Sequence, residues 1–360
     1  MTKEQGLGVQ SAPDRKTAYV ILGGPDDAQN FAKAGEILRN GGVVGFPTET
    51  VYGLGASVYC EEAIEQVFRA KGRPNDNPLI AHIADMDGLE QLVSVMPETA
   101  RKLAEAYWPG PMTLVLPKLP LVPDAVTAGL DTVGVRMPSD PNARAMLREA
   151  KVPVAAPSAN RSGKPSPTRA QHVWQDMDGR IDMILDGGQC ACGLESTVID
   201  CSGDGIVILR PGYITAKMIE DATGIVPTIG YGKDLGGSTP RAPGMKYRHY
   251  APKGKLYLAT GEGSLEEQCK AIADAYDSNF AHGSKCVILV TEQDKGFFGE
   301  REQILIGNLD DLSTIAHSVF KAFRDCDTKG YDLIYMRGVP EEGVGAAIMN
   351  RVVKASAGTV

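Results

Sequence analysis

The stretch that decides the fold is residues 41–55, which read GGVVGFPTETVYGLG. Val43 to Phe46 form an apolar run that predicts a short buried strand. Pro47 cannot donate to a strand ladder, so we expect the chain to leave the sheet there. The polar triplet 48–50 has no apolar partner at helical or strand spacing, and the glycines after Tyr52 permit a tight turn and a close approach to a neighbour. Polar groups at the carboxyl end of a strand are where open α/β sheets bind ligands.

An ordinary loop capped by threonines fits this stretch equally well, because binding loops have no composition of their own. A second unusual stretch favours a ligand site. Residues 71–78 read KGRPNDNP. Lys71 and Arg73 are followed by three short polar residues that lie between two prolines. We expect a helix over 61–71 to deliver these cations at its C-terminal end.

Length and composition limit the class of protein. The 360 residues suit two domains, and 43% hydrophobic and 23% charged residues are ordinary for globular chains. The net charge of −8 argues against stable nucleic-acid binding. No stretch approaches 18 apolar residues, and residues 1–16 lack the apolar region of a signal peptide. We therefore expect a cytoplasmic protein without a membrane span.

The seven cysteines are scattered and odd in number, as expected of reduced thiols in the cytosol. Cys190, Cys192 and Cys201 lie close in sequence, but they form no C-x-x-C pair and have no nearby histidine. We predict no protein metal site.

The organisation of the chain changes twice. Many short strands with irregular helix spacing over residues 14–224 predict an α/β domain with a twisted, mixed sheet. Residues 225–254 are rich in Gly, Pro and isolated polar residues, which predicts a linker. Strands and helices then alternate over 255–360, which predicts a small parallel α/β domain. Its clearest helix is expected from Leu312 to Asp325.

The common catalytic motifs are absent. Gly163-Lys164 is followed by Pro165, so this segment is not a P-loop. The sequence also lacks G-x-S-x-G, H-E-x-x-H and C-x-x-C motifs. A nucleophile or a metal is therefore not the expected centre of the chemistry.

Cations occur instead at the ends of predicted strands and helices. Residues 131–170 contain seven Lys or Arg against three Asp or Glu, in a chain that is acidic overall. Such a positive basin predicts a small anionic ligand. We favour solvated surface positions for Arg144, Arg148 and Arg169, which lie on predicted helices. Arg136 lies within an apolar strand and must meet an anion, because burying it unpaired is costly.

Two further positions stay open on the pattern alone. His82 lies in an apolar strand, where a core histidine is as compatible as a ligand contact. Glu195-Ser196-Thr197 follows Gly193 and fits either a turn with hydroxyl caps or a binding loop.

Together these stretches resemble the threonylcarbamoyl-adenylate synthase family in its long, two-domain form. The resemblance runs from about Gly41 to Ala355. Its matching segments are FPTETVYGLG (46–55), KGRPNDNPL (71–79), WPGPMTLVL (108–116), GLDTVGVRMP (129–138), APSANRSGKPSPT (156–168), GLESTVID (193–200), LRPG (209–212), APGMKYRHYAP (242–252) and GVGAAIMNRVVKA (343–355).

The resemblance implies an N-terminal YrdC-like catalytic domain (14–224) with an open basic cleft, a linker (225–254) that closes over the nucleotide, and a small Rossmann-like C-terminal domain (255–360). It implies synthesis of L-threonylcarbamoyl-adenylate and pyrophosphate from L-threonine, bicarbonate or CO2, and ATP with Mg²⁺. This product is the donor for modification of adenosine 37 in tRNA. A downstream tRNA-modifying threonylcarbamoyl transferase complex is therefore the implied partner.

The resemblance also assigns site residues by motif position. The threonine and carbamate contacts would be Thr50, His82, Arg136, Ala156 and Ser196. The ATP contacts would be Arg73, Asn77, Thr132, Ser158, Ser166, Arg210 and Tyr250. Lys71, Arg73 and Arg136 would stabilise the charge that spreads during the reaction.

Two alternatives remain. An RNA-binding module could use the same positive basin, and it would show steeply salt-dependent RNA affinity without ATP turnover. A carbamoyl transferase with a related domain would accept carbamoyl phosphate. The zinc-finger or acylphosphatase-like segments that usually accompany such transferases are not found in this sequence.

Overall fold

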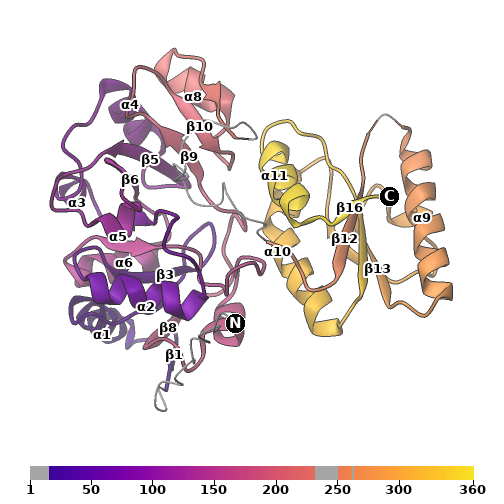
Figure 1. The fold of residues 1–360 in the computed structure, drawn as a ribbon, viewed down its shortest axis with the longest axis horizontal. Coiled ribbons are helices and arrows are strands. Elements are labelled where there is room, and N and C mark those ends of the chain that lie inside the picture. Colours follow the sequence, from indigo (N-terminus) through magenta and orange to yellow (C-terminus); the bar gives the residue numbers. More distant parts are fainter. Residues whose placement is uncertain (1–15, 232–249, 262) are drawn as a thin grey trace, which may run out of the picture.

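The computed structural model describes residues 16–231, 250–261 and 263–360. These residues form an eleven-stranded sheet and, after residue 254, a separate five-stranded sheet. Helices α10 and α11 lie between the second sheet and the first part of the chain, and α9 covers the far side of the second sheet (Figure 1).

The first part contains these strands: β1 (Ala18–Ile21), β2 (Val44–Phe46), β3 (Gly53–Ser57), β4 (Ile80–His82), β5 (Met112–Pro117), β6 (Thr132–Arg136), β7 (Val154–Ala156), β8 (Met183–Asp186), β9 (Thr197–Asp200), β10 (Val207–Arg210) and β11 (Thr228–Ile229). Its helices are α1 (Asp27–Arg39), α2 (Glu61–Lys71), α3 (Asp87–Glu90), α4 (Glu98–Tyr107), α5 (Asp124–Thr127), α6 (Pro141–Ala150), α7 (Ala170–Met177) and α8 (Ala216–Thr223). The second part contains β12 (Lys255–Ala259), α9 (Leu265–Ala281), β13 (Cys286–Thr291), the 3-10 helix η1 (Lys295–Phe297), β14 (Gln303–Gly307), α10 (Leu312–Lys329), β15 (Leu333–Arg337), α11 (Gly345–Ala355) and β16 (Gly358–Thr359).

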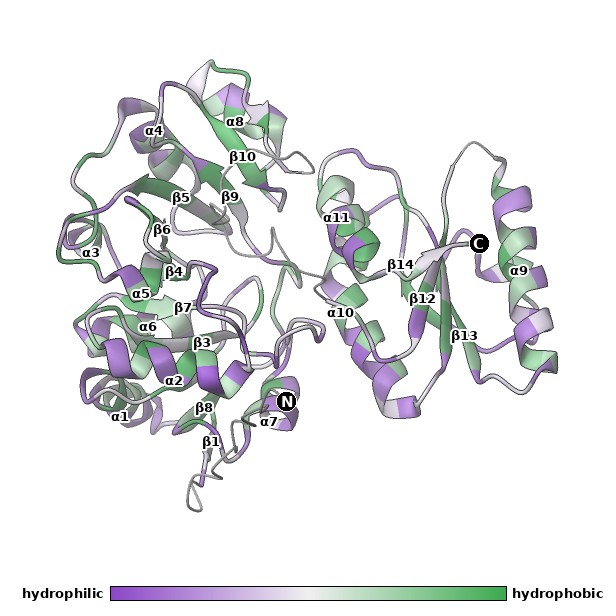
Figure 2. Cartoon of the chain, in the orientation of Figure 1, coloured by the Kyte–Doolittle hydropathy of each residue, from purple (hydrophilic) through white to green (hydrophobic). Residues whose placement is uncertain are grey.

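Both predicted sheet types are confirmed. The first sheet has the order β1-β8-β2-β3-β7-β4-β6-β5-β9-β10-β11 and mixes parallel pairs such as β4 with β6 and antiparallel pairs such as β5 with β6. The second has the order β14-β13-β15-β12-β16, and its neighbouring strands are all parallel. Strands buried on both faces read as apolar runs. Strands β5 and β13 are examples, and they are largely green in Figure 2.

The stretch 41–55 is a hairpin rather than a strand followed by a tight turn. β2 pairs antiparallel with β3, with Phe46 opposite Gly53. The predicted turn is therefore wrong, because residues 53–55 are extended in β3. The predicted close approach is correct: a Cβ on Gly53 would lie 2.7 Å from the ring of Phe46. The polar loop 47–52 connects the two strands.

Local sequence sets several helix ends. The hydroxyl of Ser264 accepts from the backbone N–H of Glu267 at 3.2 Å, and the Glu267 carboxylate accepts from the Ser264 N–H at 2.8 Å, which is a capping box for α9. The predicted helix from Leu312 is confirmed and extends to Lys329, where Gly330 ends it with φ of +68°. The sequence Thr168-Arg169-Ala170-Gln171 has the pattern of a capping box and would predict a capped helix start, but the structure does not form one. α7 begins at Ala170, and no side chain caps it.

The predicted linker is partly structured at its start. Thr228 and Ile229 form β11, which pairs with Val207 and Ile208 of β10. Residues 242–249 of the linker motif lie outside the described residues. Within the described chain, no helix is both long and apolar enough to cross a membrane.

One hydrophobic cluster joins the two parts of the chain. Val51 and Leu194 from the first part and Tyr250 belong to the buried cluster built mainly from α10, α11 and the second sheet. The Tyr250 ring stacks on Phe320 of α10 at a centroid distance of 5.3 Å. Because Val51 lies in the loop after β2, this contact brings the C-terminal part close to the polar triplet 48–50.

Candidate active site

Strand ends and loops converge on one recess whose empty volume, including its open mouth, is about 750 Å³. Ten of the predicted site residues line it, namely Thr50, Lys71, Arg73, His82, Arg136, Ala156, Ser158, Ser196, Arg210 and Tyr250. Asn77, Thr132 and Ser166 are not among the lining residues.

Sheet register explains why distant residues meet. His82 and Arg136 are direct partners at the carboxyl ends of the parallel strands β4 and β6. Ala156, at the end of β7, lies opposite Ile80 of β4. Thr132 begins β6 and therefore lies four residues away along the strand from Arg136, which accounts for its place outside the lining.

Arg136 meets an anion inside the protein, as its apolar context predicted. Its Nη2 lies 2.8 Å from Oε1 of Glu49, and both side chains are buried. The contact lacks hydrogen-bond geometry: among the described residues, neither Nε nor Nη2 of Arg136 has a hydrogen-bond partner, and neither carboxylate oxygen of Glu49 has one. The guanidinium therefore keeps donors that can serve a ligand carboxylate, which Arg binds with two parallel bonds.

The polar loop after β2 is preorganised by its own hydroxyls. Thr48 Oγ1 donates to the carbonyl of Val51 at 2.6 Å and accepts from the backbone N–H of Thr50 at 3.2 Å. The hydroxyls of Thr48 and Thr50 lie 2.9 Å apart. Thr50 is fully buried and lines the recess, and the contact with Thr48 fixes its hydroxyl.

A second hydroxyl, that of Ser196, is held by Arg210. Arg210 Nε donates to the Ser196 carbonyl and Nη2 to the Ser196 hydroxyl, each at 3.1 Å. Ser196 Oγ also lies 2.8 Å from the Thr113 hydroxyl on β5. Burial lowers the pKa of Arg210 to about 10, so it remains a cation at neutral pH. The loop 193–197 is therefore held at both the hydroxyl and the backbone carbonyl of Ser196.

Lys71 secures a site loop. Its Nζ donates to the carbonyls of Ser158 and Asn160, the latter at 2.7 Å. Burial, and after it the charge of Arg73, lowers the pKa of Lys71 well below its ordinary value. Arg73 Nη2 donates to the Asn77 carbonyl at 3.0 Å, while the Asn77 side-chain amide is buried without a hydrogen-bond partner among the described residues.

Neutral His82 is part of the lining. Its Nδ1 lies 3.0 Å from the Ile80 carbonyl, and burial, together with the charge of Arg136, lowers its pKa to about 3. The histidine is buried and also lines the recess, while its contact with a ligand stays a prediction.

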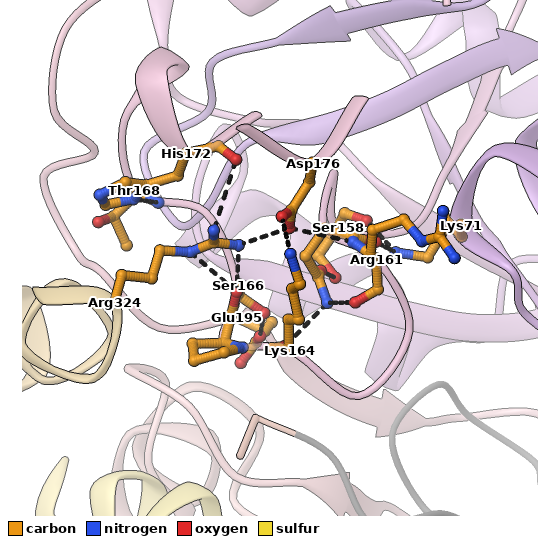
Figure 3. Close-up of polar contacts among 12 residues, drawn as sticks. Lys71, Ser158, Arg161, Lys164, Ser166, Thr168, His172, Asp176, Glu195 and Arg324 are labelled. Atoms are coloured by element: carbon orange, nitrogen blue, oxygen red, sulfur yellow. Dashed lines mark hydrogen bonds and ion pairs between the residues drawn. The ribbon is translucent and has the colours of Figure 1, made fainter. Parts of the chain in front are cut away.

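Loop 161–166 is held by Asp176 of α7 and Arg324 of α10 (Figure 3). Asp176 accepts from Lys164 Nζ at 2.6 Å, from the Arg161 N–H at 3.1 Å and from Arg324 Nη2 at 2.9 Å. Arg324 also donates twice to the carbonyl of Pro165. A cation of the C-terminal part thus holds a loop that lines the recess.

The sequence did not predict the roles of Glu49, Glu195 and Arg351, and the predicted positions of Arg144 and Arg169 are wrong. Glu195 lines the recess, and Arg351 of α11 donates to it, although Arg351 could have been noticed as a cation within the apolar run IMNRVV. Arg144 and Arg169 are not solvated as predicted. They are half-buried and donate to the Ala84 carbonyl and to Gln189, because neighbouring turns offer acceptors.

Comparison with known proteins covers nearly the whole chain. A family model described as telomere recombination matches residues 36–212, and the model of the threonylcarbamoyl-AMP synthase C-terminal domain matches residues 214–357. Threonylcarbamoyl-AMP synthase of Bacillus subtilis is 44% identical over 92% of this chain and 94% of its own. The chain belongs to the threonylcarbamoyl-AMP synthase family.

Other members of the threonylcarbamoyl-AMP synthase family agree with this assignment, and the predicted family is confirmed. The Pyrococcus abyssi synthase is 46% identical over 90% of this chain and 93% of its own. The solved structure of P. abyssi Sua5 complexed with L-threonine has a TM-score of 0.86 at 42% identity and covers 96% of this chain and 99% of that one. The family therefore includes two-part relatives of the same length and fold.

Proposed function

We propose that this chain makes L-threonylcarbamoyl-adenylate and pyrophosphate from L-threonine, bicarbonate or CO2, and ATP, the first step of threonylcarbamoyl modification of adenosine 37 in tRNA. The observation that carries the proposal is the convergence of Arg136, Thr50, Ser196 and Arg210 on one recess. Cations and hydroxyls without a nucleophile suit a reaction in which the substrates supply both attacking atoms.

The threonine side of the recess is built by Arg136, Thr50 and Ser196. The buried donors Nε and Nη2 of Arg136 would bind the threonine carboxylate. The hydroxyls of Thr50 and Ser196 would recognise the substrate hydroxyl, with neutral His82 and Ala156 shaping the pocket. A site that hydrogen-bonds a substrate hydroxyl rejects analogues that lack it, because its own polar groups would be left unpaired.

The remaining lining residues would form the nucleotide side of the recess. Arg73, Arg210 and the loop carrying Ser158 would contact ATP, with Asn77, Thr132 and Ser166 as neighbours in the same role. Lys71 would add positive charge while holding the loop in place. Among the described residues no cluster of three His, Cys, Asp or Glu could hold a metal. We therefore treat Mg²⁺ as part of the MgATP substrate.

The bonds change in two steps. The threonine amine attacks the carbon of CO2 and loses a proton, which gives a carbamate. A carbamate oxygen then attacks the α-phosphorus, and the bond to the β-phosphate oxygen breaks, which releases pyrophosphate. Holding the reactants in place supplies roughly 7–11 kcal/mol of such a barrier. Fixed cations then stabilise the negative charge that spreads over the phosphates.

The proposal includes a working division of the chain into 14–224, 225–254 and 255–360. The middle segment would close over the nucleotide and exclude water from a hydrolysable adenylate. In support, Tyr250 is buried, lines the recess and stacks on Phe320 of α10. All seven cysteines are free, which suits a reducing cytoplasm, where the product would pass to a tRNA-modifying transferase.

Pyrophosphate release tests this proposal. The full chain is incubated with MgATP, bicarbonate and L-threonine, and each substrate is left out in turn. We expect release that requires all three. Release that continues without threonine, or turnover of carbamoyl phosphate in place of bicarbonate, would favour another activity. RNA binding without any turnover would favour the binding module instead.

A further inference from the structure

A fully buried arginine of the C-terminal part reaches the candidate site. Arg351 lies on α11, and its side chain has no exposed surface. Its Nε donates to Oε2 of Glu195 at 3.0 Å, and Nη2 donates to the Glu195 carbonyl at 3.3 Å. Nη1 donates to the Pro211 carbonyl just beyond β10. The guanidinium therefore bridges the loop that precedes β9 and the loop that follows β10.

Its partner Glu195 lines the recess as a buried anion. Burial raises the pKa of Glu195, but the charges of Arg351 and Arg210 and the hydrogen bond from Ser166 outweigh burial and hold it below its ordinary value. Ser166 donates its hydroxyl to Oε1, as Figure 3 shows. Oε2 is taken by Arg351, so both carboxylate oxygens point at fixed donors.

Arg210 belongs to the same group of charges. Glu195 raises the pKa of Arg210 and Arg351 lowers it, so the three side chains interact electrostatically, and Arg210 donates to the adjacent residue Ser196. A carboxylate beside a triphosphate site is unfavourable unless its charge is balanced, because like charges repel strongly in a buried site. The buried Arg351 supplies that balance from outside the recess.

We propose that Arg351 is a positioning residue: it neutralises Glu195 and holds its carboxylate in place, so that the charge of Arg210 acts on the nucleotide phosphates. The inference rests on the proposed function for the nature of the nucleotide. Without Arg351, the Glu195 carboxylate would compete with the triphosphate for Arg210. The C-terminal part would then tune nucleotide affinity in addition to covering the site.

A double-mutant cycle tests this role. We measure the Kd of MgATP by calorimetry, and kcat and KM for ATP, in the wild type, Arg351→Met, Glu195→Gln and the double variant. Arg351→Met should weaken ATP binding about tenfold, the scale of one lost charge-assisted contact. Adding Glu195→Gln should restore the Kd to within about threefold of the Glu195→Gln variant, a coupling that independent sites do not show. KM for ATP should move more than kcat.

Arg324→Met is the matched control. Arg324 is another buried arginine that joins α10 to a site loop, but its ion-pair partner is Asp176. Glu195→Gln should not improve ATP binding in this background. Arg351→Lys keeps the charge and should bind ATP more tightly than Arg351→Met. Thermal melting of each variant reports whether the fold survives. If Arg351→Met does not fold, the Kd values of the double variant and of Arg351→Lys are compared with that of Glu195→Gln. This comparison then tests the coupling between Arg351 and Glu195.

Several results would overturn the inference. Unchanged ATP affinity in folded Arg351→Met would do so, as would equal rescue of Arg324→Met by Glu195→Gln, since both point to a structural role alone. If the wild type binds ATP but makes no adenylate, the proposed function fails while the Kd cycle still tests Arg351. If the wild type does not bind ATP, both proposals fall.

Discussion

Nη2 of Arg136 at the end of β6 lies 2.8 Å from Oε1 of Glu49 in the loop after β2, and both side chains are buried. Removing one partner of such a pair leaves an uncompensated charge and costs roughly 3–5 kcal/mol of stability. The pair thus makes the central arginine of the site part of the fold as well. A useful substitution must keep the charge.

Arg136→Lys meets this requirement. Lysine retains a cation beside Glu49 but cannot present two parallel donors to a carboxylate. We expect kcat/KM for L-threonine to fall about 10- to 100-fold, which corresponds to one charge-assisted hydrogen bond. Steady-state pyrophosphate release measures the effect. Arg148→Lys, at an exposed position on α6, is the control. An unchanged kcat/KM in Arg136→Lys would remove Arg136 from the threonine site.

Ser196→Ala tests the second hydroxyl. The substitution removes the acceptor of Arg210 Nη2 and leaves the Thr113 hydroxyl without its 2.8 Å neighbour. KM for threonine should rise by roughly tenfold, the cost of an unpaired buried polar group. Adding Thr113→Val removes the unpaired hydroxyl and should recover stability in urea unfolding but not KM. Recovery of KM as well would mean that Ser196 acts only through packing.

Stability should depend on pH through His82 and His172. Burial lowers the pKa of each to about 3, with help from neighbouring arginines. Both stay neutral in the folded protein, while the unfolded chain takes up protons below about pH 6.5. Stability should therefore fall as the pH drops from about 6.5 towards 3, by up to roughly 1.4 kcal/mol per pH unit for each histidine.

Urea unfolding at pH 7 and pH 5 measures this slope. His172→Asn keeps an acceptor for the Thr168 N–H, which now donates to Nδ1 at 3.3 Å, and should flatten the slope. Equal slopes in the wild type and His172→Asn would contradict the prediction.

The hairpin of β2 and β3 predicts a packing effect. A Cβ on Gly55 would lie 2.7 Å from Cγ1 of Val154 and 2.9 Å from the Phe46 ring. Gly55→Ala should destabilise the protein by roughly 1–3 kcal/mol, the usual cost of overpacking. Gly203→Ala is the control, because nothing lies within 4 Å of the Cβ it would add. Equal unfolding midpoints would show that the sheet adjusts freely.

Sequence patterns predicted what depends on local chemistry. Apolar runs gave both sheet types, and Arg136 within one such run required a buried anion. The partner Glu49 was not predicted as that anion, because it lies far away along the chain and only the sheet order brings it near. The second strand of the hairpin, at 53–55, was not predicted. In the sequence, glycines that pack against an aromatic ring cannot be distinguished from glycines that form a turn.

The roles of the C-terminal part were hardest to predict. Arg324 and Arg351 contact residues about 150 positions earlier in the chain, and no spacing rule connects them. Thr132 shows the opposite limit: a motif position can be assigned from resemblance while its side chain lies outside the recess of this structure. Whether it contacts ATP stays a prediction.

Mass spectrometry of the product made from ¹³C-bicarbonate tests the central claim most directly. The protein is incubated with MgATP, L-threonine and labelled bicarbonate, and the nucleotide products are analysed at early times. The account predicts threonylcarbamoyl-adenylate that carries one heavy carbon and forms in equal amounts with pyrophosphate. Formation of unlabelled threonyl-adenylate, or ATP consumption without a carbamoylated adenylate, would contradict it.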